Sequence, residues 1–488
     1  MSSGAGAGLE FSIQVDTGQL GVDADHVESL ITVQADPGGA LSPQAPAAVI
    51  LVMDMSLSMV GQNKFRRAQE AVCTAIDAIP DGAFLGIIAG NDKAARVFPP
   101  AGGLATVGAG TREAAKRAVK RLLPSGGTKI GGWLTAVSVL FAQAPAAVGV
   151  RHAVLYSDGK NEHETREQLD VALAACADQF VCDVRGLGDD WDYRELKHIT
   201  DALQGDAVAV LDIKDLAADL TALVNRLRRI VVPRAYLRLS PSSRFRVASI
   251  AQTHPVRVDV KQEELTDGTA IDVPLGAWEG REAKRYHVSL GFDPATVPVE
   301  RRLRAARVDL CVEAADGTRV SCADVPLTVL RYAAPDPQTV LPDDNFTRIE
   351  DERLLGLAMH ACVDAWMLQN ADEANGELNE AFRLARSLGD VRLPLLEGVS
   401  DVTGDGAARL RANVTPGEMQ ELGLNATATE WRDRPQDPQR SREPRDDPGG
   451  RPGKPAARTR VCLCGQLNDE GANFCATCCA PLRRRATS

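Results

Sequence analysis

The sequence contains no apolar run long enough to span a bilayer, so nothing in it predicts a transmembrane helix. Its first residues lack the basic segment and the apolar core of a secretory signal, and we therefore expect a cytoplasmic protein. The chain also lacks an excess of positive charge. Its formal net charge is −11, which argues against a protein that coats nucleic acid as a whole. What is present, 44% hydrophobic and 25% charged residues, is typical of a soluble globular protein.

The cysteines are few along most of the chain and clustered at its end. Of the eleven, six are isolated in apolar or mixed stretches, where reduced core residues are expected, and five fall within residues 462–479. In a cytoplasmic chain, such clustering favours a metal site over disulfide bonds.

The clustered cysteines form two pairs separated by a loop. Thiolates from Cys462, Cys464, Cys475 and Cys478 could close a tetrahedral Zn²⁺ site, and the metal would then supply the folding free energy of so small a piece. The segment resembles the short zinc-ribbon modules of many multidomain bacterial proteins. Its first pair is spaced one residue more tightly than usual, and Cys479 remains an alternative to Cys478 as the fourth ligand.

At 488 residues the chain should hold about three domains of ~150 residues each. Over residues 46–230, apolar strands alternate with amphipathic helices. This alternation predicts an α/β domain with a doubly wound, mostly parallel sheet and helices on both faces.

The pattern changes over residues 231–334, where short alternating strands are separated by turns such as "TDGT" and "ADGT". This is typical of an antiparallel β-sandwich. Residues 1–45 contain two further strands of period two, which have no obvious place in a parallel sheet. We predict that they join the sandwich, so that the α/β domain is inserted in it. Strand pairing between residues 10–35 and 231–334 would distinguish this arrangement from a sandwich that merely follows the α/β domain.

The remaining segments differ from both domains. Residues 335–430 are predicted to be helical, with a helical hairpin that ends at Gly389. Residues 431–460 contain Pro, Arg, Asp and Gly but almost no apolar residue, which predicts a disordered tether. The zinc ribbon would then occupy residues 461–488.

Oxygen-bearing side chains follow the predicted strands of the α/β domain. The apolar run "ILVM" ends at Asp54, and Ser56 and Ser58 follow at alternate positions. Thr128 lies in the glycine-rich stretch "PSGGTKIGG", and Asp158 follows the strand "VLYS". In a doubly wound sheet such loops gather at the carboxyl edge, so the five side chains are expected to converge. Hard oxygen ligands of this kind suit Mg²⁺.

This set resembles the metal-ion-dependent adhesion site of the von Willebrand factor A family, which has Asp-x-Ser-x-Ser, then Thr, then Asp. The resemblance covers residues 46–230 and implies a Rossmann-like fold. It also implies that the serines and the threonine bind Mg²⁺ or another divalent cation, while the aspartates bind it directly or through water.

The charges of these residues suggest how the site would be used. If one aspartate binds only through water, the cation keeps a net positive charge and an open position, which an Asp or Glu of a protein partner could fill. We therefore predict a non-enzymatic adaptor, with the tethered zinc ribbon as a second contact and no membrane or nucleic-acid role.

The sequence leaves two alternatives. A metal-dependent phosphohydrolase centred on Asp54 would require a second aspartate where Ser56 stands, and the lysine of "GGTKIGG" follows the threonine, the wrong order for a phosphate-binding loop. A nucleic-acid-associated regulatory protein would act through the zinc ribbon and the basic tail "RRRATS".

Overall fold

The computed structural model describes residues 2–429 and the segments 459–461 and 467–469, with gaps at 7–8, 19, 22, 38–45, 146–147, 159, 228, 260–262, 265–269, 315–316, 333–343 and 403–406. The chain divides into two compact units, Met1–Trp431 and Arg432–Ser488. Within the described residues, no helix combines the length and the apolar character that crossing a membrane requires.

A seven-stranded sheet lies at the centre of the α/β region. Five of its strands run parallel, and two short strands pair antiparallel with one of them at the edge. The spatial order is β10 (Ala207–Val210), β9 (Val181–Leu187), β8 (Val150–Ser157), β4 (Ala47–Asp54), β5 (Phe84–Gly90) and β6 (Ala94–Phe98), with β7 (Ala105–Thr106) also on β5. The predicted α/β fold with a mostly parallel sheet is confirmed. The antiparallel edge was not predicted, because β6 is short and largely exposed.

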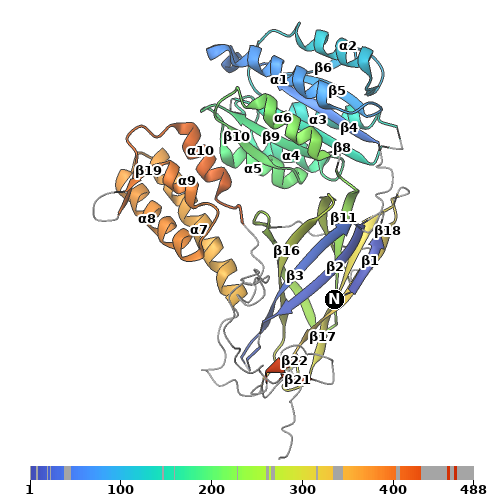
Figure 1. The fold of residues 1–488 in the computed structure, drawn as a ribbon, viewed down its shortest axis with the longest axis vertical. Coiled ribbons are helices and arrows are strands. Elements are labelled where there is room, and N and C mark those ends of the chain that lie inside the picture. Colours follow the sequence, from blue (N-terminus) through green and yellow to red (C-terminus); the bar gives the residue numbers. More distant parts are fainter. Residues whose placement is uncertain are drawn as a thin grey trace, which may run out of the picture. The chain divides into compact units, whose positions relative to one another are not determined.

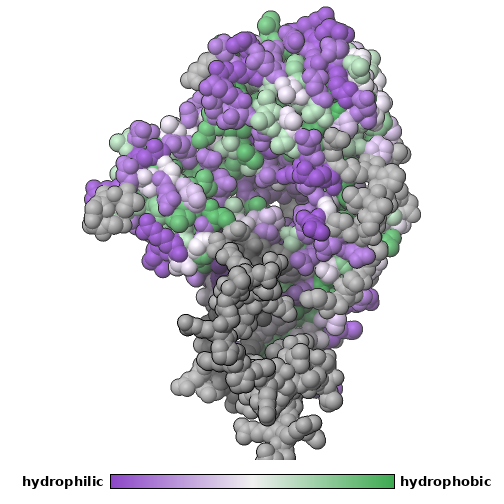
Figure 2. Space-filling model, in the orientation of Figure 1, coloured by the Kyte–Doolittle hydropathy of each residue, from purple (hydrophilic) through white to green (hydrophobic). Residues whose placement is uncertain are grey.

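Helices cover both faces of this sheet (Figure 1). Alternate residues of β4 point to opposite faces, as the pleat of a strand requires. Leu51 and Met53 belong to one hydrophobic core, and Ile50 and Val52 belong to the other. The first core is covered by α1 (Lys64–Ala78), α2 (Ala109–Val119) and α6 (Leu216–Leu227), and the second by α3 (Ile130–Phe141), α4 (Arg166–Cys176) and α5 (Tyr193–Leu203). Burial on both faces explains the continuous apolar run of β4. The surface over α1 and α2 is mostly hydrophilic (Figure 2).

The strands that precede and follow the α/β region in the sequence form two antiparallel sheets. These two sheets share one hydrophobic core. Phe11 from the first sheet packs edge-on against Trp278 from the second, with ring centroids 5.5 Å apart. The first sheet has the order β1 (Ser2–Gly6), β2 (Leu9–Thr17), β3 (His26–Pro37), β16 (Glu282–Phe292), β12 (Phe245–His254), β13 (Val258–Asp259), and the second β14 (Glu263–Glu264), β15 (Ile271–Trp278), β11 (Val232–Pro241), β17 (Leu303–Glu313), β18 (Arg319–Val329).

The ladder between β3 and β16 joins the two ends of this β region. It is antiparallel and runs from the pair Glu282 and Ala35 to the pair Gly291 and His26. The pairing predicted between residues 10–35 and 231–334 is therefore present. Strands that precede the α/β region pair with strands that follow it.

The helical segment packs against the α/β region. The segment contains α7 (Asp344–Met367), α8 (Ala371–Leu388), α9 (Leu393–Gly398) and α10 (Pro416–Asn425), with a short hairpin of β19 (Ser400–Val402) and β20 (Ala408–Leu410) that was not predicted. Its apolar residues belong to the same hydrophobic core as those of α3, α4 and α5. The Tyr193 backbone N–H donates to Gln420 Oε1 at 2.8 Å, and the Tyr193 ring stacks on His360. Gly389, in the left-handed conformation, ends α8 as expected.

In the C-terminal unit, the description is limited to the antiparallel pair β21 (Thr459–Val461) and β22 (Leu467–Asp469). The predicted zinc ligands Cys462, Cys464, Cys475 and Cys478, and the alternative Cys479, lie outside the described residues. Nearly all of the predicted tether, residues 431–460, lies outside them as well. The zinc site and the tether therefore stay predictions.

Candidate metal centre

The topology of the sheet brings the predicted ligands to one edge. Asp54 is the last residue of β4, and Asp158 directly follows β8, the parallel neighbour of β4. Ser58 lies in the 3-10 helix η1 (Leu57–Asn63), which follows the Asp54 turn, and Thr128 lies two residues before α3. The carboxyl ends of adjacent parallel strands meet at one edge, so residues far apart in the chain become neighbours here.

Hydrogen bonds connect four of the five predicted ligands. The Ser56 backbone N–H donates to Asp54 Oδ1 at 2.7 Å. The hydroxyl oxygens of Ser56 and Ser58 lie 2.8 Å apart, and Ser58 Oγ donates to Asp158 Oδ1 at 2.6 Å. The last contact spans 100 residues of chain. The side-chain oxygens of Ser56, Ser58 and Asp158 thus form one connected cluster, and Asp54 is bonded to its first member.

Backbone hydrogen bonds hold the loop before Thr128 against the loop after Asp54. The Leu57 N–H donates to Gly126 O at 3.1 Å, and the Ser125 N–H donates to Met55 O at 2.6 Å. Thr128 itself is buried, with 4% of its surface exposed. The structure therefore places the fifth predicted residue in the loop that packs on the other four.

The glycines of the Thr128 loop are required by the close approach of its neighbours. Gly126 has a φ of +75°, a conformation that disfavours residues with a side chain. A Cβ on Gly127 would lie 1.9 Å from Cε1 of His163. The His163 backbone N–H also donates to Thr128 O at 3.1 Å, so His163 fixes this loop from the other side.

The two aspartates differ from ordinary surface carboxylates because both are fully buried. Burial, together with the smaller effect of the nearby Asp158, raises the pKa of Asp54 to about 6, even though hydrogen bonds from Ser157 and Ser56 favour its charged form. Among the described residues, the hydrogen bonds that Asp54 accepts come from neutral donors, the Ser56 N–H and the Ser157 hydroxyl. Asp54 is a buried carboxylate to which a cation would be a favourable addition.

Two residues of the site were not identified from the sequence. Ser157 donates to Asp54 Oδ2, and the ammonium of Lys64 lies 2.7 Å from Asp158 Oδ2. Ser157 could have been suspected because it directly precedes Asp158. Lys64 could not, because the first residue of a helix carries no local sign of a partner 94 positions away.

The donor set fits a hard divalent cation. It consists of two carboxylates and three hydroxyls, all buried except that of Ser58, and Mg²⁺ prefers oxygen ligands while keeping some of its water. In the described part of the chain, no group of three or more His, Cys, Asp or Glu side chains is placed to hold a metal. Metal binding at this edge would therefore depend on the hydroxyls of Ser56, Ser58 and Thr128 as well as on the aspartates.

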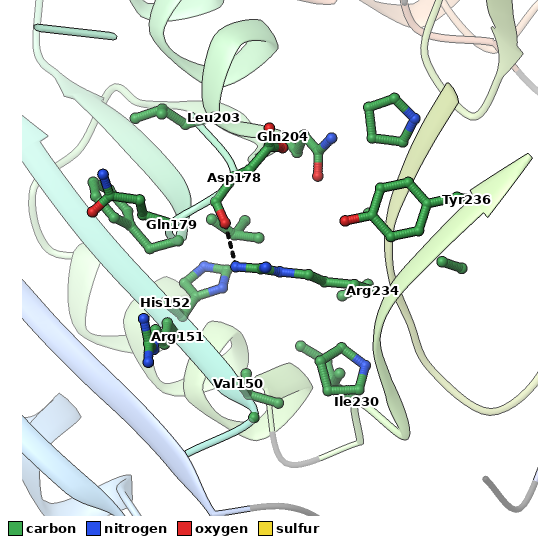
Figure 3. A pocket seen from close by; sticks show the side chains of 18 residues that line it. Val150, Arg151, His152, Asp178, Gln179, Leu203, Gln204, Ile230, Arg234 and Tyr236 are labelled. Atoms are coloured by element: carbon green, nitrogen blue, oxygen red, sulfur yellow. Dashed lines mark hydrogen bonds between the residues drawn. The ribbon is translucent and has the colours of Figure 1, made fainter. Parts of the chain in front are cut away.

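A pocket elsewhere in the molecule is separate from this centre (Figure 3). It lies at the amino end of β8, where Val150 and His152 line it together with Arg234 and Tyr236 of β11. Arg234 donates to the backbone carbonyl of Asp178 across the pocket. Because β8 spans eight residues at ~3.3 Å each, the pocket is roughly 20 Å from the carboxyl edge of the sheet.

Comparison with known proteins agrees with this geometry. Residues 47–209 match the family model described as the von Willebrand factor type A domain. The structure of a von Willebrand factor type A protein from Catenulispora acidiphila is similar over 86% of this chain and 97% of that one, with 27% identity and a TM-score of 0.78. The ArnB paralogue VWA2 from Sulfolobus acidocaldarius is similar in fold over 86% of this chain and 98% of its own, with 15% identity and a TM-score of 0.54. No curated protein sequence matched the chain. The predicted von Willebrand factor type A domain is confirmed over residues 47–209, the part of the chain that the family model matches.

Proposed function

We propose that the chain is a non-enzymatic adaptor that binds a protein partner through a divalent cation at the carboxyl edge of the α/β sheet. The observation that carries the proposal is the largely buried oxygen cluster, in which the Ser58 hydroxyl donates to Asp158 and Asp54 accepts hydrogen bonds only from neutral donors among the described residues. The type A domain match over residues 47–209 supports the same proposal.

Each ligand would contribute according to its place in the structure. The hydroxyl oxygens of Ser56, Ser58 and Thr128 can turn their lone pairs toward a cation, while the Ser58 hydroxyl still donates its hydrogen bond to the Asp158 carboxylate. Asp54 and Asp158 would supply the negative charge, directly or through water. When bound, Mg²⁺ would offer an open position to a carboxylate from an Asp or Glu of the partner. The exposure of Ser58 leaves the cluster open toward solvent on that side.

The zinc ribbon is proposed as a second contact. Zn²⁺ held by Cys462, Cys464, Cys475 and Cys478 would order the C-terminal segment, and residues 431–460 would connect it to the rest of the chain. Two modest contacts on a flexible tether can produce useful avidity. A cytoplasmic setting, in which thiolates stay reduced, forms part of this proposal.

The first test is binding of Mg²⁺ itself, by isothermal titration calorimetry on the full chain. We expect a single site in the wild type and no binding in Asp54→Ala, with circular dichroism unchanged between the two proteins. A folded Asp54→Ala variant that binds Mg²⁺ like the wild type would remove the proposed site.

The second test concerns the partner and the absence of enzymatic activity. Capture of a partner should require Mg²⁺, be lost in EDTA and be lost in Asp54→Ala. Release of phosphate from ester substrates that disappears in Asp54→Asn would instead favour the hydrolase alternative. Salt-sensitive binding of DNA or RNA by the full chain, lost on removal of residues 455–488, would favour the nucleic-acid alternative.

A further inference from the structure

Lys64 is a charged residue that contacts the candidate centre and that the proposed function does not use. Its ammonium lies 2.7 Å from Asp158 Oδ2, and its side chain is 14% exposed. The other oxygen of Asp158 accepts the Ser58 hydroxyl. Both oxygens of a proposed ligand carboxylate are therefore engaged by groups of the chain itself.

A second carboxylate lies within reach of the same ammonium. Asp190 Oδ2 is 3.9 Å from Lys64 Nζ, and the Asp190 side chain is 72% exposed. Gly188, two residues before Asp190, also approaches the ammonium closely, since a Cβ there would be 3.6 Å from Lys64 Nζ. A small rotation of the lysine side chain would move its charge from the buried Asp158 to the exposed Asp190.

The charge count of the centre depends on this lysine. Asp54 and Asp158 carry two negative charges when ionised, which a divalent cation neutralises. With Lys64 the filled centre has a net charge of +1, and without it the net charge is zero. The ammonium therefore repels the incoming metal but attracts a carboxylate that approaches the filled centre.

We propose that Lys64 acts as a built-in cation that competes with the divalent metal for Asp158 and gives the filled centre its preference for a carboxylate. This inference rests on the proposed metal site. It assigns two opposite effects to one side chain: Lys64 weakens binding of the metal and strengthens binding of the acidic ligand. A residue that only supported the fold would change both in the same direction.

The first experiment measures Mg²⁺ affinity by isothermal titration calorimetry. Lys64→Met should bind Mg²⁺ about tenfold more tightly than the wild type, a change well above the error of the method. Lys93→Met is the matched control, because Lys93 is an exposed lysine in the loop after β5, at the same edge of the sheet. It removes the same charge without removing a partner of Asp158 and should leave the affinity within about twofold.

The second experiment uses acetate as the carboxylate probe. Binding of acetate and of Mg²⁺ is reciprocal, so the enhancement of Mg²⁺ affinity by sodium acetate over sodium chloride measures their coupling. The wild type and Lys93→Met should show this enhancement. Lys64→Met should lose most of it, and Lys64→Arg should retain it because the positive charge is kept.

The outcomes separate this inference from the proposed function. If the wild type binds Mg²⁺ and a folded Lys64→Met variant binds it equally or more weakly, the role of Lys64 is wrong while the metal site stands. If Lys64→Met lost both its affinity for Mg²⁺ and the enhancement of that affinity by acetate, Lys64 would be a structural residue. If neither protein binds Mg²⁺, both proposals fail. Lys64→Gln, whose amide can still donate to Asp158, replaces Lys64→Met if thermal unfolding shows that the latter does not fold.

Discussion

Two buried aspartates of the same α/β region, Asp54 and Asp183, have opposite surroundings. Both are fully buried. Asp183, in β9, lies 3.0 Å from His152 Nε2 and 3.2 Å from Arg226 Nη2, and it accepts the Asp206 N–H at 2.7 Å. Asp54 accepts hydrogen bonds from neutral donors among the described residues.

The pKa values follow these surroundings. Burial alone would raise the pKa of Asp183, but His152, Arg226 and Arg185 hold it well below its usual range. Burial raises the pKa of Asp54 to about 6. One carboxylate is neutralised by cations from the chain itself, and the other is suited to a cation from outside. Equal burial thus accompanies cationic partners in one case and, in the other, the proposed role in binding a metal.

The largest expected effect is a loss of stability on substitution of Asp183, the carboxylate that has cationic partners within the chain. Asp183→Asn would remove the fully buried carboxylate that lies against His152 Nε2 and Arg226 Nη2, and should lower the free energy of unfolding by about 3–5 kcal/mol. Urea denaturation measures this change. Asp212→Asn is the control, because Asp212 pairs with Lys214 at the surface and should cost less than about 1 kcal/mol. Equal effects of the two substitutions would contradict the comparison.

Unlike Asp183→Asn, the substitution Asp54→Asn should not destabilise the metal-free protein. Without metal, the variant should be at least as stable as the wild type at neutral pH, because the substitution removes a buried charge that lacks a cationic partner. The stabilisation of the wild type by Mg²⁺, about 2.7 kcal/mol at a hundredfold excess over Kd, should disappear. Thermal unfolding with Mg²⁺ and with EDTA tests both parts. A strong destabilisation in EDTA would place Asp54 in the same class as Asp183.

A smaller effect is expected at the Thr128 loop. In Gly127→Ala the new Cβ would collide with the His163 ring, so the loop or the ring must shift, and Mg²⁺ affinity should fall several-fold. Gly61→Ala, where a Cβ meets nothing within 4 Å, is the control in the neighbouring η1 and should keep the wild-type affinity. Calorimetry with Mg²⁺ measures both. The double variant Gly127→Ala/His163→Ala should recover affinity, and failure to do so would show that the collision is not the cause.

The smallest expected effect concerns a carboxylate outside both centres. Burial, together with the smaller effects of Asp192 and Glu164, raises the pKa of Glu195 to about 7. The folded state therefore binds this proton more tightly than the unfolded state, and its stabilising contribution is lost as pH rises from about 4.5 to about 7. Glu195→Gln should raise the Tm above pH 7 and leave it nearly unchanged at pH 4.5. An equal change of Tm at both pH values would contradict the raised pKa.

The loop after β4 was predictable because its signal is local. Three oxygen-bearing residues within five positions, directly after an apolar run, identify the turn at Asp54 without knowledge of the rest of the chain. The convergence of Thr128 and Asp158 on this turn required one more step, the rule that parallel strands share a carboxyl edge. Both steps depend on general properties of α/β sheets.

The partners of the buried charges were not predictable in this way. The pairing of Lys64 with Asp158, and of Arg226 with Asp183, joins residues 94 and 43 positions apart. The sequence around Asp183 shows a buried strand but gives no sign that cations surround this carboxylate. The packing of α10 on α5 through Gln420 was missed for the same reason.

By itself, the sequence determined the strand–helix alternation, the parallel sheet and the positions of five oxygen-bearing side chains, because these follow from local apolar patterns and from short-range spacing. Only the tertiary structure decided which buried carboxylate has cations of its own and which does not. The physical reason is that the charge balance of a buried group depends on all the side chains that surround it in space, and these come from strands and helices far apart in the chain.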